Sequence, residues 1–315
     1  MRILITGAAG FIGANLARFL GPEHELVGLD DLSTGNVTNL EAVPIDLMIG
    51  SILDPSALAT AVAGCDAIVH LAARPSVPRS ISDPVASHEA NATGTLRVLE
   101  AARSAASASG EPPMVIIASS SSVYGSNPVI PKREDLMPMP MSPYAVSKLA
   151  AEQYALAWQT SFGLSTLAFR FFNVYGPLQA PGHAYAAVIP AFLHAAITGT
   201  DAVIHGDGTQ SRDFTFVETV CEVISTALEQ RITSPNPVNL AFGSRTSLLD
   251  LLQEIESVTG TSVSRKHTDS RLGDVYASQA DNAQLTRLFP NVTPTPLRTG
   301  LDATATWMRA QIEDV

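Results

Sequence analysis

The sequence predicts an α/β protein: a doubly wound parallel sheet with a smaller C-terminal α/β lobe that binds substrate. Over residues 1–173, short apolar segments alternate with helical segments, which is typical of a parallel sheet covered on both faces. A glycine-rich turn joins the first strand to the first helix. Residues 174–315 have shorter segments mixed with Pro and Gly, so we expect a second, smaller lobe, with some segments of the chain crossing between the two.

Composition sets the class of protein. The chain has 315 residues, 46% of them hydrophobic, and a net charge of −11, which argues against binding nucleic acid. Cys65 and Cys221 lie far apart without the spacing of metal ligands, so we expect reduced core residues and no metal site. The sequence shows no signal peptide pattern and no apolar run long enough for a membrane span. We therefore expect a cytoplasmic protein.

The first unit has the context of a dinucleotide-binding turn. Residues 2–6 predict a buried strand and residues 14–20 a helix, with Gly7, Gly10 and Gly13 between them in the spacing G-x-x-G-x-x-G. The glycines permit a tight turn and a close approach to a pyrophosphate, which the helix N-terminus attracts. A second strand, 25–29, ends at Asp30. A carboxylate there accepts hydrogen bonds from a ribose and repels a 2′-phosphate, so a Rossmann-type domain that binds NAD is predicted.

The alternation continues through the first region. We predict strands at 45–49, 67–71, 114–118 and 165–170, and helices at 55–63, 84–106 and 143–162. Ligands of such sheets bind at the carboxyl ends of the strands. Asp30, Ala72, Ser120 and Asn173 come directly after strands, so we expect them to meet in one cleft with Tyr144.

Helix 143–162 carries the strongest chemical signal. Tyr144 and Lys148 are four residues apart and lie on one face of the helix, which Ser142 can cap and Pro143 can begin. A neighbouring ammonium favours the phenolate, so Tyr144 is a candidate general base. The pair alone also fits an ordinary helix with an exposed lysine.

The C-terminal region gives weaker signals. Residues 174–184 predict an irregular loop, followed by a segment at 204–208 that ends in Gly-Asp-Gly. Helices are predicted near 185–197, 217–229 and 247–258, and after Pro296.

Taken with the segment Arg-Phe-Phe-Asn-Val-Tyr-Gly-Pro at 170–177, these motifs make the sequence resemble the extended short-chain dehydrogenase/reductase family. Within it the chain is similar to the nucleotide-sugar 4-epimerases, typified by UDP-glucose 4-epimerase, over nearly its whole length. The resemblance implies NAD as cofactor and a UDP-sugar as substrate. It also implies a homodimer paired through helices 84–106 and 143–162, although the pattern of these helices fits packing on the sheet equally well.

The resemblance assigns the catalytic roles. Tyr144 is the base, and Lys148 holds the nicotinamide ribose and lowers the pKa of Tyr144. The catalytic hydroxyl, four residues before Tyr124, is Ser120, with Ser121 as the alternative. In the implied reaction, hydride passes from C4 of the sugar to NAD. The 4-keto sugar then turns about its diphosphate link, and hydride returns to the other face.

The resemblance also implies the binding residues. The cofactor-binding positions are Gly7, Gly10, Phe11, Ile12, Gly13, Asp30, Asp31, Ser33, Gly35, Ser51, Ile52, Leu71, Ala72, Ala73, Ser119, Tyr144, Lys148 and Phe171. The substrate-binding positions are Ser76, Val77, Asn91, Ser120, Ser121, Tyr144, Asn173, Ala187, Val188, His205, Arg212, Arg271, Asp274 and Ser278. Among these, Arg212 and Arg271 match a pair that clamps the diphosphate, a role that suits guanidinium groups. His205 could reach the uracil or be an ordinary surface histidine.

Three positions depart from the family pattern. Asp31 replaces an Asn, Ser51 replaces an Asp that contacts the adenine, and Pro75 stands where some members have a Lys. These changes affect cofactor contacts and leave the catalytic residues intact.

The substrate is indicated by the size of one residue. The resemblance places Ser278 at a gate beside the sugar C2 group, where a Tyr is associated with plain hexoses and a small residue leaves room for an N-acetyl group. We therefore expect 4-epimerisation of UDP-glucose and UDP-galactose and also of the N-acetyl pair.

Three alternatives are weighed against that expectation. A sugar 4,6-dehydratase would carry Asp-Glu where this chain has Ser121-Ser122. A UDP-glucuronate 4-epimerase or decarboxylase is harder to exclude from sequence. A non-catalytic NAD-binding sensor would tend to lose Tyr144 or Lys148.

Overall fold

The computed structural model describes residues 1–105, 110–181, 187–269 and 277–313. Arg271 and Asp274, two of the predicted substrate-binding residues, lie outside these ranges. The main sheet has seven strands in the order β11-β6-β5-β4-β1-β2-β3, and every neighbouring pair is parallel. The strands are β1 (Arg2–Thr6), β2 (Glu25–Asp30), β3 (Ile45–Ile49), β4 (Ala67–His70), β5 (Met114–Ser120), β6 (Thr166–Phe171) and β11 (Val238–Leu240). The strand order reverses between β1 and β4, which confirms the predicted Rossmann-type sheet.

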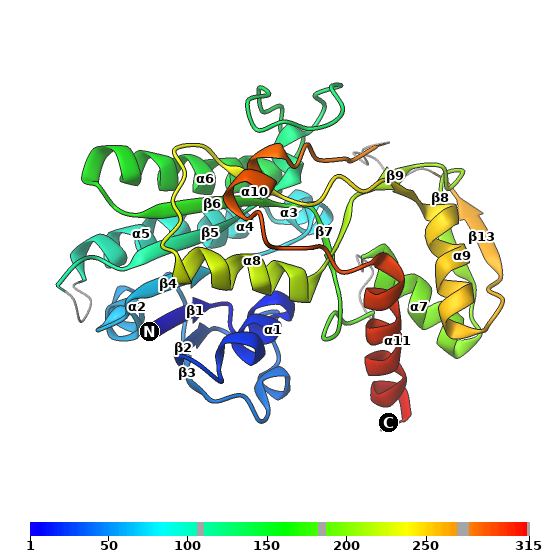
Figure 1. The fold of residues 1–315 in the computed structure, drawn as a ribbon, viewed down its shortest axis with the longest axis horizontal. Helices are drawn as coiled ribbons and strands as arrows, with labels where there is room; N and C mark the ends of the chain where they lie inside the picture. The colour runs from blue at the N-terminus through cyan, green and yellow to red at the C-terminus, as the bar shows by residue number, and fades with distance from the viewer. Residues whose placement is uncertain (106–109, 182–186, 270–276, 314–315) are drawn as a thin grey trace.

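Helices cover both faces of this sheet (Figure 1). One face carries α1 (Phe11–Leu20) and α8 (Val217–Glu229), and the other carries α2 (Pro55–Val62), α5 (Gly94–Ser104) and α6 (Pro143–Phe162). Because side chains of a strand alternate, Ile3 and Ile5 enter one core and Leu4 the other. Each fully buried side chain of this kind contributes roughly 1.5–3 kcal/mol.

The helix predicted over 84–106 is interrupted. The structure has α4 (Pro84–His88), a π-helical turn (Glu89–Thr93) and then α5. A short helix that was not predicted, α3 (Val77–Ser82), precedes them. Periodicity misses such a turn because it inserts only one extra residue, yet π-turns often occur at functional sites.

The C-terminal lobe lies to one side of the sheet (Figure 1). Its helices α7 (Val188–Thr198), α9 (Leu248–Thr259) and α11 (Leu297–Glu313) contact one another. Three two-stranded sheets belong to this half: β8 (Ala202–His205) with β13 (Arg265–Thr268), β9 (Ser211–Arg212) with β12 (Thr246–Ser247), and β10 (Phe214–Phe216) with β7 (Asn173–Tyr175). The loop predicted at 174–184 therefore begins inside a strand.

Part of the C-terminal half returns to the first region. Helix α8 packs on α1, and β11 forms the edge of the main sheet beside β6. Helix α10 (Ala283–Leu288) contacts β11. The segment 217–240 falls within the range predicted for the lobe, but it lies with the Rossmann-type sheet.

Candidate active site

The glycine turn after β1 is closely packed. Gly7 has φ +72°, and a Cβ there would lie 2.7 Å from the backbone nitrogen of Ala72. A Cβ on Gly13 would lie 2.1 Å from the Gly7 carbonyl oxygen. Gly10 is the N-cap of α1 and offers no side-chain cap, so the first-turn N–H groups of Phe11 and Ile12 are open to an anion.

Asp30 lies at the end of β2, next to this turn. It is buried, and its Oδ2 and Oδ1 accept hydrogen bonds from the backbone N–H groups of Ala9 (2.9 Å) and Leu32 (2.8 Å). A carboxylate oxygen has more than one acceptor site, so each can also accept from a ribose hydroxyl. An uncapped helix N-terminus beside a fixed carboxylate is the set of donors and acceptors that a dinucleotide requires. These residues therefore fit NAD.

The remaining cofactor positions surround this turn. Asp31 is exposed and accepts from the Ser33 N–H (2.9 Å), and a Cβ on Gly35 would lie 2.9 Å from Ala9. The Ser51 hydroxyl accepts from the Leu53 N–H (3.2 Å), and the next residue, Ile52, is buried. Leu71, Ala72 and Ala73 follow β4, and Phe171 ends β6.

A hydrogen-bonded chain fixes the loop after β4. Thr95 donates to the Asn91 carbonyl (2.6 Å), so its hydroxyl accepts from His70 Nε2 (3.0 Å). His70 Nδ1 then accepts from the Thr6 hydroxyl (2.7 Å), which itself accepts from the Ala72 N–H (3.3 Å). Burial and the nearby Lys148 lower the pKa of His70 to about 3, so the ring stays neutral and keeps this tautomer.

Asn91 lies on the π-turn and is 1% exposed. Its Oδ1 accepts from the Arg74 N–H (2.7 Å), and its Nδ2 donates to the Arg74 carbonyl (3.2 Å) and to the Ser147 hydroxyl (3.0 Å). Both amide hydrogens are thus used within the protein. Asn91 therefore joins the loop after β4 to α6, and its predicted substrate contact stays a prediction.

Tyr144, Lys148 and Ser120 come together at the carboxyl edge of the sheet. Ser142 caps α6 by accepting from the Ala145 N–H (3.2 Å), and Pro143 begins the helix. Burial raises the pKa of Tyr144, and a hydrogen bond with the Ser120 side chain lowers it. The base and the predicted serine are therefore neighbours.

Lys148 is buried against the backbone of β5. Its Nζ donates to the carbonyl oxygen of Ala118 (2.9 Å), and burial lowers the pKa of Lys148 to about 8. The pKa of Tyr144 is raised by burial and lowered by Ser120 in this structure. The predicted effect of Lys148 on the pKa of Tyr144 stays a prediction.

Ser119 is bonded to α6. It is 3% exposed, and its hydroxyl donates to Oε2 of Glu152 on α6 (2.8 Å). Its predicted contact with the cofactor stays a prediction. Its side chain is occupied within the protein. Ser121 begins the 3₁₀ turn Ser121–Tyr124.

The predicted substrate residues approach from both regions. Ser76 caps α3 with an unusual φ of 97°, a strain that occurs often at ligand sites, and Val77 begins that helix. Ala187 and Val188 begin α7. Asn173 begins β7, where its Nδ2 donates to the Asp213 carbonyl (3.1 Å).

Arg212 and Ser278, predicted for the diphosphate clamp and the sugar gate, lie on neighbouring segments. Arg212 lies on β9, and the Ser278 N–H donates to the carbonyl of the adjacent Ser211 (3.1 Å). Ser278 is half-buried, and its backbone contact with Ser211 places it near Arg212. His205 ends β8, and its Nδ1 bonds the Thr268 hydroxyl (2.8 Å).

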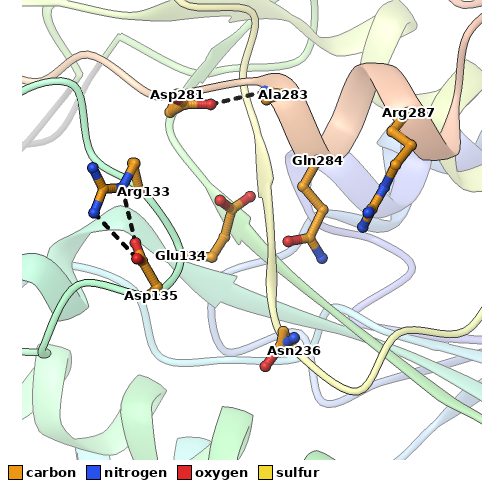
Figure 2. A pocket seen from close by; sticks show the side chains of 8 residues that line it. All are labelled: Arg133, Glu134, Asp135, Asn236, Asp281, Ala283, Gln284 and Arg287. Atoms are coloured by element: carbon orange, nitrogen blue, oxygen red, sulfur yellow. Dashed lines mark hydrogen bonds and ion pairs between the residues drawn. The ribbon is translucent and has the colours of Figure 1, made fainter.

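A hollow of about 480 Å³ lies elsewhere on the surface (Figure 2). Its lining comprises Arg133, Glu134, Asp135, Asn236, Asp281, Ala283, Gln284 and Arg287. None of these residues is a predicted site residue, and Arg133 pairs with Asp135. Over the described ranges, no group of three His, Cys, Asp or Glu side chains could hold a metal ion, and no helix is long and apolar enough to cross a membrane.

Comparison with known proteins decides the family. The model of the NAD dependent epimerase/dehydratase family matches residues 3–241, well over half of the chain. The chain belongs to this family. It is therefore an NAD-dependent enzyme of the epimerase type, and the cofactor that its glycine turn and Asp30 fit is NAD.

Relatives of this NAD-dependent epimerase align over nearly its full length. UDP-glucose 4-epimerase of Mycolicibacterium smegmatis is 37% identical and covers 90% of this chain and 91% of its own. The UDP-N-acetylglucosamine 4-epimerase of Methanobrevibacter ruminantium, solved with UDP-N-acetylmuramic acid, has a TM-score of 0.92 at 32% identity and 98% coverage of both chains. The UDP-glucuronic acid 4-epimerase of Bacillus cereus, solved with UDP-glucuronic acid and NAD, has a TM-score of 0.87 at 30% identity, covering 99% of this chain and all of that one.

Sequence reasoning missed two residues of this epimerase's site. His70 lies within the strand predicted at 67–71, and apolar periodicity does not reveal that its side chain fixes the loop beside the glycine turn. Glu152 was not considered, although it lies four residues after Lys148 and so on the same helix face as Tyr144 and Lys148. That spacing was the available signal.

Proposed function

We propose that this protein interconverts UDP-glucose with UDP-galactose, and UDP-N-acetylglucosamine with UDP-N-acetylgalactosamine, by reversible oxidation at C4. The observation that carries the proposal is that Ser120 ends β5 and Tyr144 begins α6 at the sheet edge that also bears the glycine turn, close enough for the Ser120 side chain to lower the pKa of Tyr144. A base and a hydroxyl donor beside a dinucleotide site suit oxidation of a secondary alcohol.

The chain's own residues move and hold protons. Tyr144, as phenolate, takes the proton of the 4-hydroxyl group and later returns it. Ser120 donates a hydrogen bond to the same oxygen while it has carbonyl character, which stabilises the developing charge. Lys148, held on the Ala118 carbonyl, keeps a positive charge below its pKa of about 8. The chemistry that NAD supplies when bound is acceptance and return of the C4 hydride.

Arg212 and Arg271 are proposed to bind the diphosphate, and Ser278 to line the C2 side of the sugar. The position of Ser278 beside β9 supports this, because a small residue next to the clamp leaves room for an N-acetyl group. The bound UDP-N-acetylmuramic acid in a relative of 32% identity is consistent with such room.

UDP-glucuronate is the second candidate substrate. It is favoured by solved relatives of this fold, including the Bacillus cereus UDP-glucuronic acid 4-epimerase at 30% identity. A carboxylate at C6 would need its own cation or hydroxyl contact within the site.

The test uses purified protein without added NAD. UDP-galactose and UDP-N-acetylgalactosamine are supplied in equal amounts, and their anomeric protons are followed by NMR. Conversion of both supports the proposal, and conversion of UDP-galactose alone contradicts the size argument at Ser278. If neither changes, the proposed substrates are wrong, and UDP-glucuronate is tried next.

We also infer that the enzyme is a cytoplasmic homodimer. Val85 on α4 and Val146 on α6 are 70% and 52% exposed, on two helices that contact each other. Apolar side chains on adjoining helices suit a second copy. Light scattering should show a dimer that Val146→Glu converts to monomer. A monomeric native protein would contradict the inference.

A further inference from the structure

A buried ion pair lies beneath the catalytic residues. Glu152 on α6 is 0% exposed and Arg170 on β6 is 2% exposed. The carboxylate accepts two hydrogen bonds from the guanidinium, from Nη2 at 2.7 Å and from Nε at 2.8 Å. Two parallel bonds fix the orientation of both side chains as well as their distance.

The pair fastens α6 to two strands at once. Ser119 and Arg170 are partners in the register of β5 and β6, so both side chains face α6. Glu152 accepts from both, and one turn earlier Lys148 donates to the Ala118 carbonyl of β5. Tyr144 lies one turn before Lys148 on the same helix face. The same contacts with the strands therefore fix the positions of Tyr144, Lys148 and Glu152 relative to the sheet.

Arg170 is held from its other side as well. Its guanidinium lies 4.7 Å from the centre of the Tyr124 ring, and its Nη1 donates to the Glu134 carbonyl (3.3 Å). The Tyr124 hydroxyl donates to Asn239 Oδ1 (2.7 Å), and the Asn239 N–H donates to the Glu134 carboxylate (2.9 Å). Glu134 lies at the surface hollow of Figure 2, so the contacts run from α6 to that surface.

A buried ion pair is weak evidence for stability, because the desolvation of both charges offsets their attraction. Geometry is the better account here, since the three shortest hydrogen bonds of Glu152 come from Ser119 and Arg170, on two strands that carry part of the site. We propose that Glu152 is a positioning residue, which with Arg170 holds α6 so that Tyr144 meets Ser120. This rests on the proposed function only for the reaction used to test it.

The pair also balances charge near the base. The titratable groups around this stack, within the described residues, are Lys148 and Glu152 on α6, Arg170 on β6, Tyr124 and Glu134 beside Arg170, and the neutral His70. Glu152 lies two helical turns after Tyr144 on α6. Removing its carboxylate takes away a negative charge at roughly 12 Å along the helix and leaves the charge of Arg170 uncompensated, which favours the phenolate and lowers the pKa of Tyr144 by roughly one pH unit.

The experiment compares three variants with the native enzyme. Glu152→Gln keeps the shape and removes the charge, Glu152→Asp keeps the charge and shortens the reach, and Glu152→Gln with Arg170→Met removes both charges. We measure kcat and KM for UDP-galactose across pH. Independently, ultraviolet difference titration against Tyr144→Phe gives the pKa of Tyr144 without any substrate. Glu25→Gln, which removes an exposed carboxylate paired with Arg2 and away from α6, is the matched control.

We expect Glu152→Gln to lower kcat at least tenfold with KM within twofold, and to move the acid limb of kcat and the Tyr144 titration downward by about one pH unit. The double variant should return the limb to its native position, and Glu152→Asp should lower kcat with the limb unmoved. A Glu152→Gln enzyme whose activity falls only with its folded fraction, at an unchanged Tyr144 pKa, overturns the proposal. A shifted titration in a protein inactive on UDP-galactose would instead retain the positioning role and reject the substrate.

Discussion

The region up to residue 173 and the lobe after it are built from different kinds of contact. In the first region, Asp30 and Ser120 end two strands of one parallel sheet, and Tyr144 and Lys148 share one helix. In the lobe, β8 pairs with β13, although His205 and Thr268 are 63 residues apart. The chemistry is therefore carried by local patterns, whereas the choice of sugar depends on segments that meet only after folding.

The largest effect is expected from the first region. Tyr144→Phe removes the hydroxyl that exchanges the proton and should lower kcat about 10³-fold, with little change in KM or thermal stability. Steady-state kinetics with UDP-galactose and a melting curve test this. If kcat changes less than tenfold, Tyr144 is not the base, and the view that the first region carries the chemistry is wrong.

Lys148→Met should separate activity from stability. The buried Lys148 ammonium has its pKa lowered from 10.5 to about 8, so replacing it should raise the free energy of unfolding by about 2–3 kcal/mol near pH 7. Activity should fall about 10²-fold because the charge beside Tyr144 is lost. Denaturant unfolding and kinetics on one sample measure both.

The size of that stabilisation changes with pH in a defined window. Between pH 8 and 10.5 the unfolded chain retains the Lys148 proton that the folded chain has released, so the stability of the native protein rises with pH. The advantage of Lys148→Met should therefore be largest below pH 8 and vanish above 10.5. An advantage that is constant with pH would mean that packing, and not the buried charge, causes it.

Substrate choice tests the lobe. Ser278→Tyr should lower kcat/KM for UDP-N-acetylgalactosamine about 10²-fold and leave UDP-galactose within about threefold, because a phenol ring fills the space of the N-acetyl group. Ser278→Ala, which stays small, is the control and should change neither. Equal loss of both reactions would place Ser278 in a general structural role.

Most of the first region's fold could be predicted from the sequence. The strand at 45–49 and the helix at 143–162 have the bounds expected, because a short, mainly apolar segment identifies the strand and a Ser-Pro start identifies the helix. The π-turn at 89–93 and the short helix α3 could not be predicted from periodicity. Neither could the return of β11 to the sheet, because a three-residue strand has almost no pattern of its own.

The candidate site was predictable to the extent that it is local. Gly7, Asp30 and the Tyr144–Lys148 pair follow from spacing along one element or one turn. The roles of Ser119 and Asn91 could not be predicted, because their partners Glu152 and Arg74 lie on other elements. A hydroxyl or amide reveals its role only when its hydrogen-bond partners are known.

Asp213 offers a structural test of the lobe. It is fully buried, and its carboxylate accepts from the N–H groups of Gly243 (3.0 Å), Ser244 (3.1 Å) and Ala280 (3.1 Å) and from the Ser244 hydroxyl (2.8 Å). Asp213→Asn turns an amide toward donors and should cost about 2–3 kcal/mol of unfolding free energy. Because Ala280 and Arg212 are neighbours of the gate, KM should rise more than kcat falls. Asp207→Asn, an exposed position, is the control.

The smallest effect is expected from an exposed ion pair of the lobe, the counterpart of the buried pair under α6. Arg265 donates to Glu256 Oε2 (3.1 Å) with 39% and 22% of the two side chains exposed. Arg265→Ala should therefore cost less than about 0.5 kcal/mol. Glu256→Ala should cost about 1 kcal/mol, because Glu256 Oε1 also accepts from the Val263 N–H (2.9 Å), which would lose its partner. Denaturant melts of both variants should show this inequality. Equal losses would mean that the ion pair, and not the backbone contact, holds this turn of the lobe.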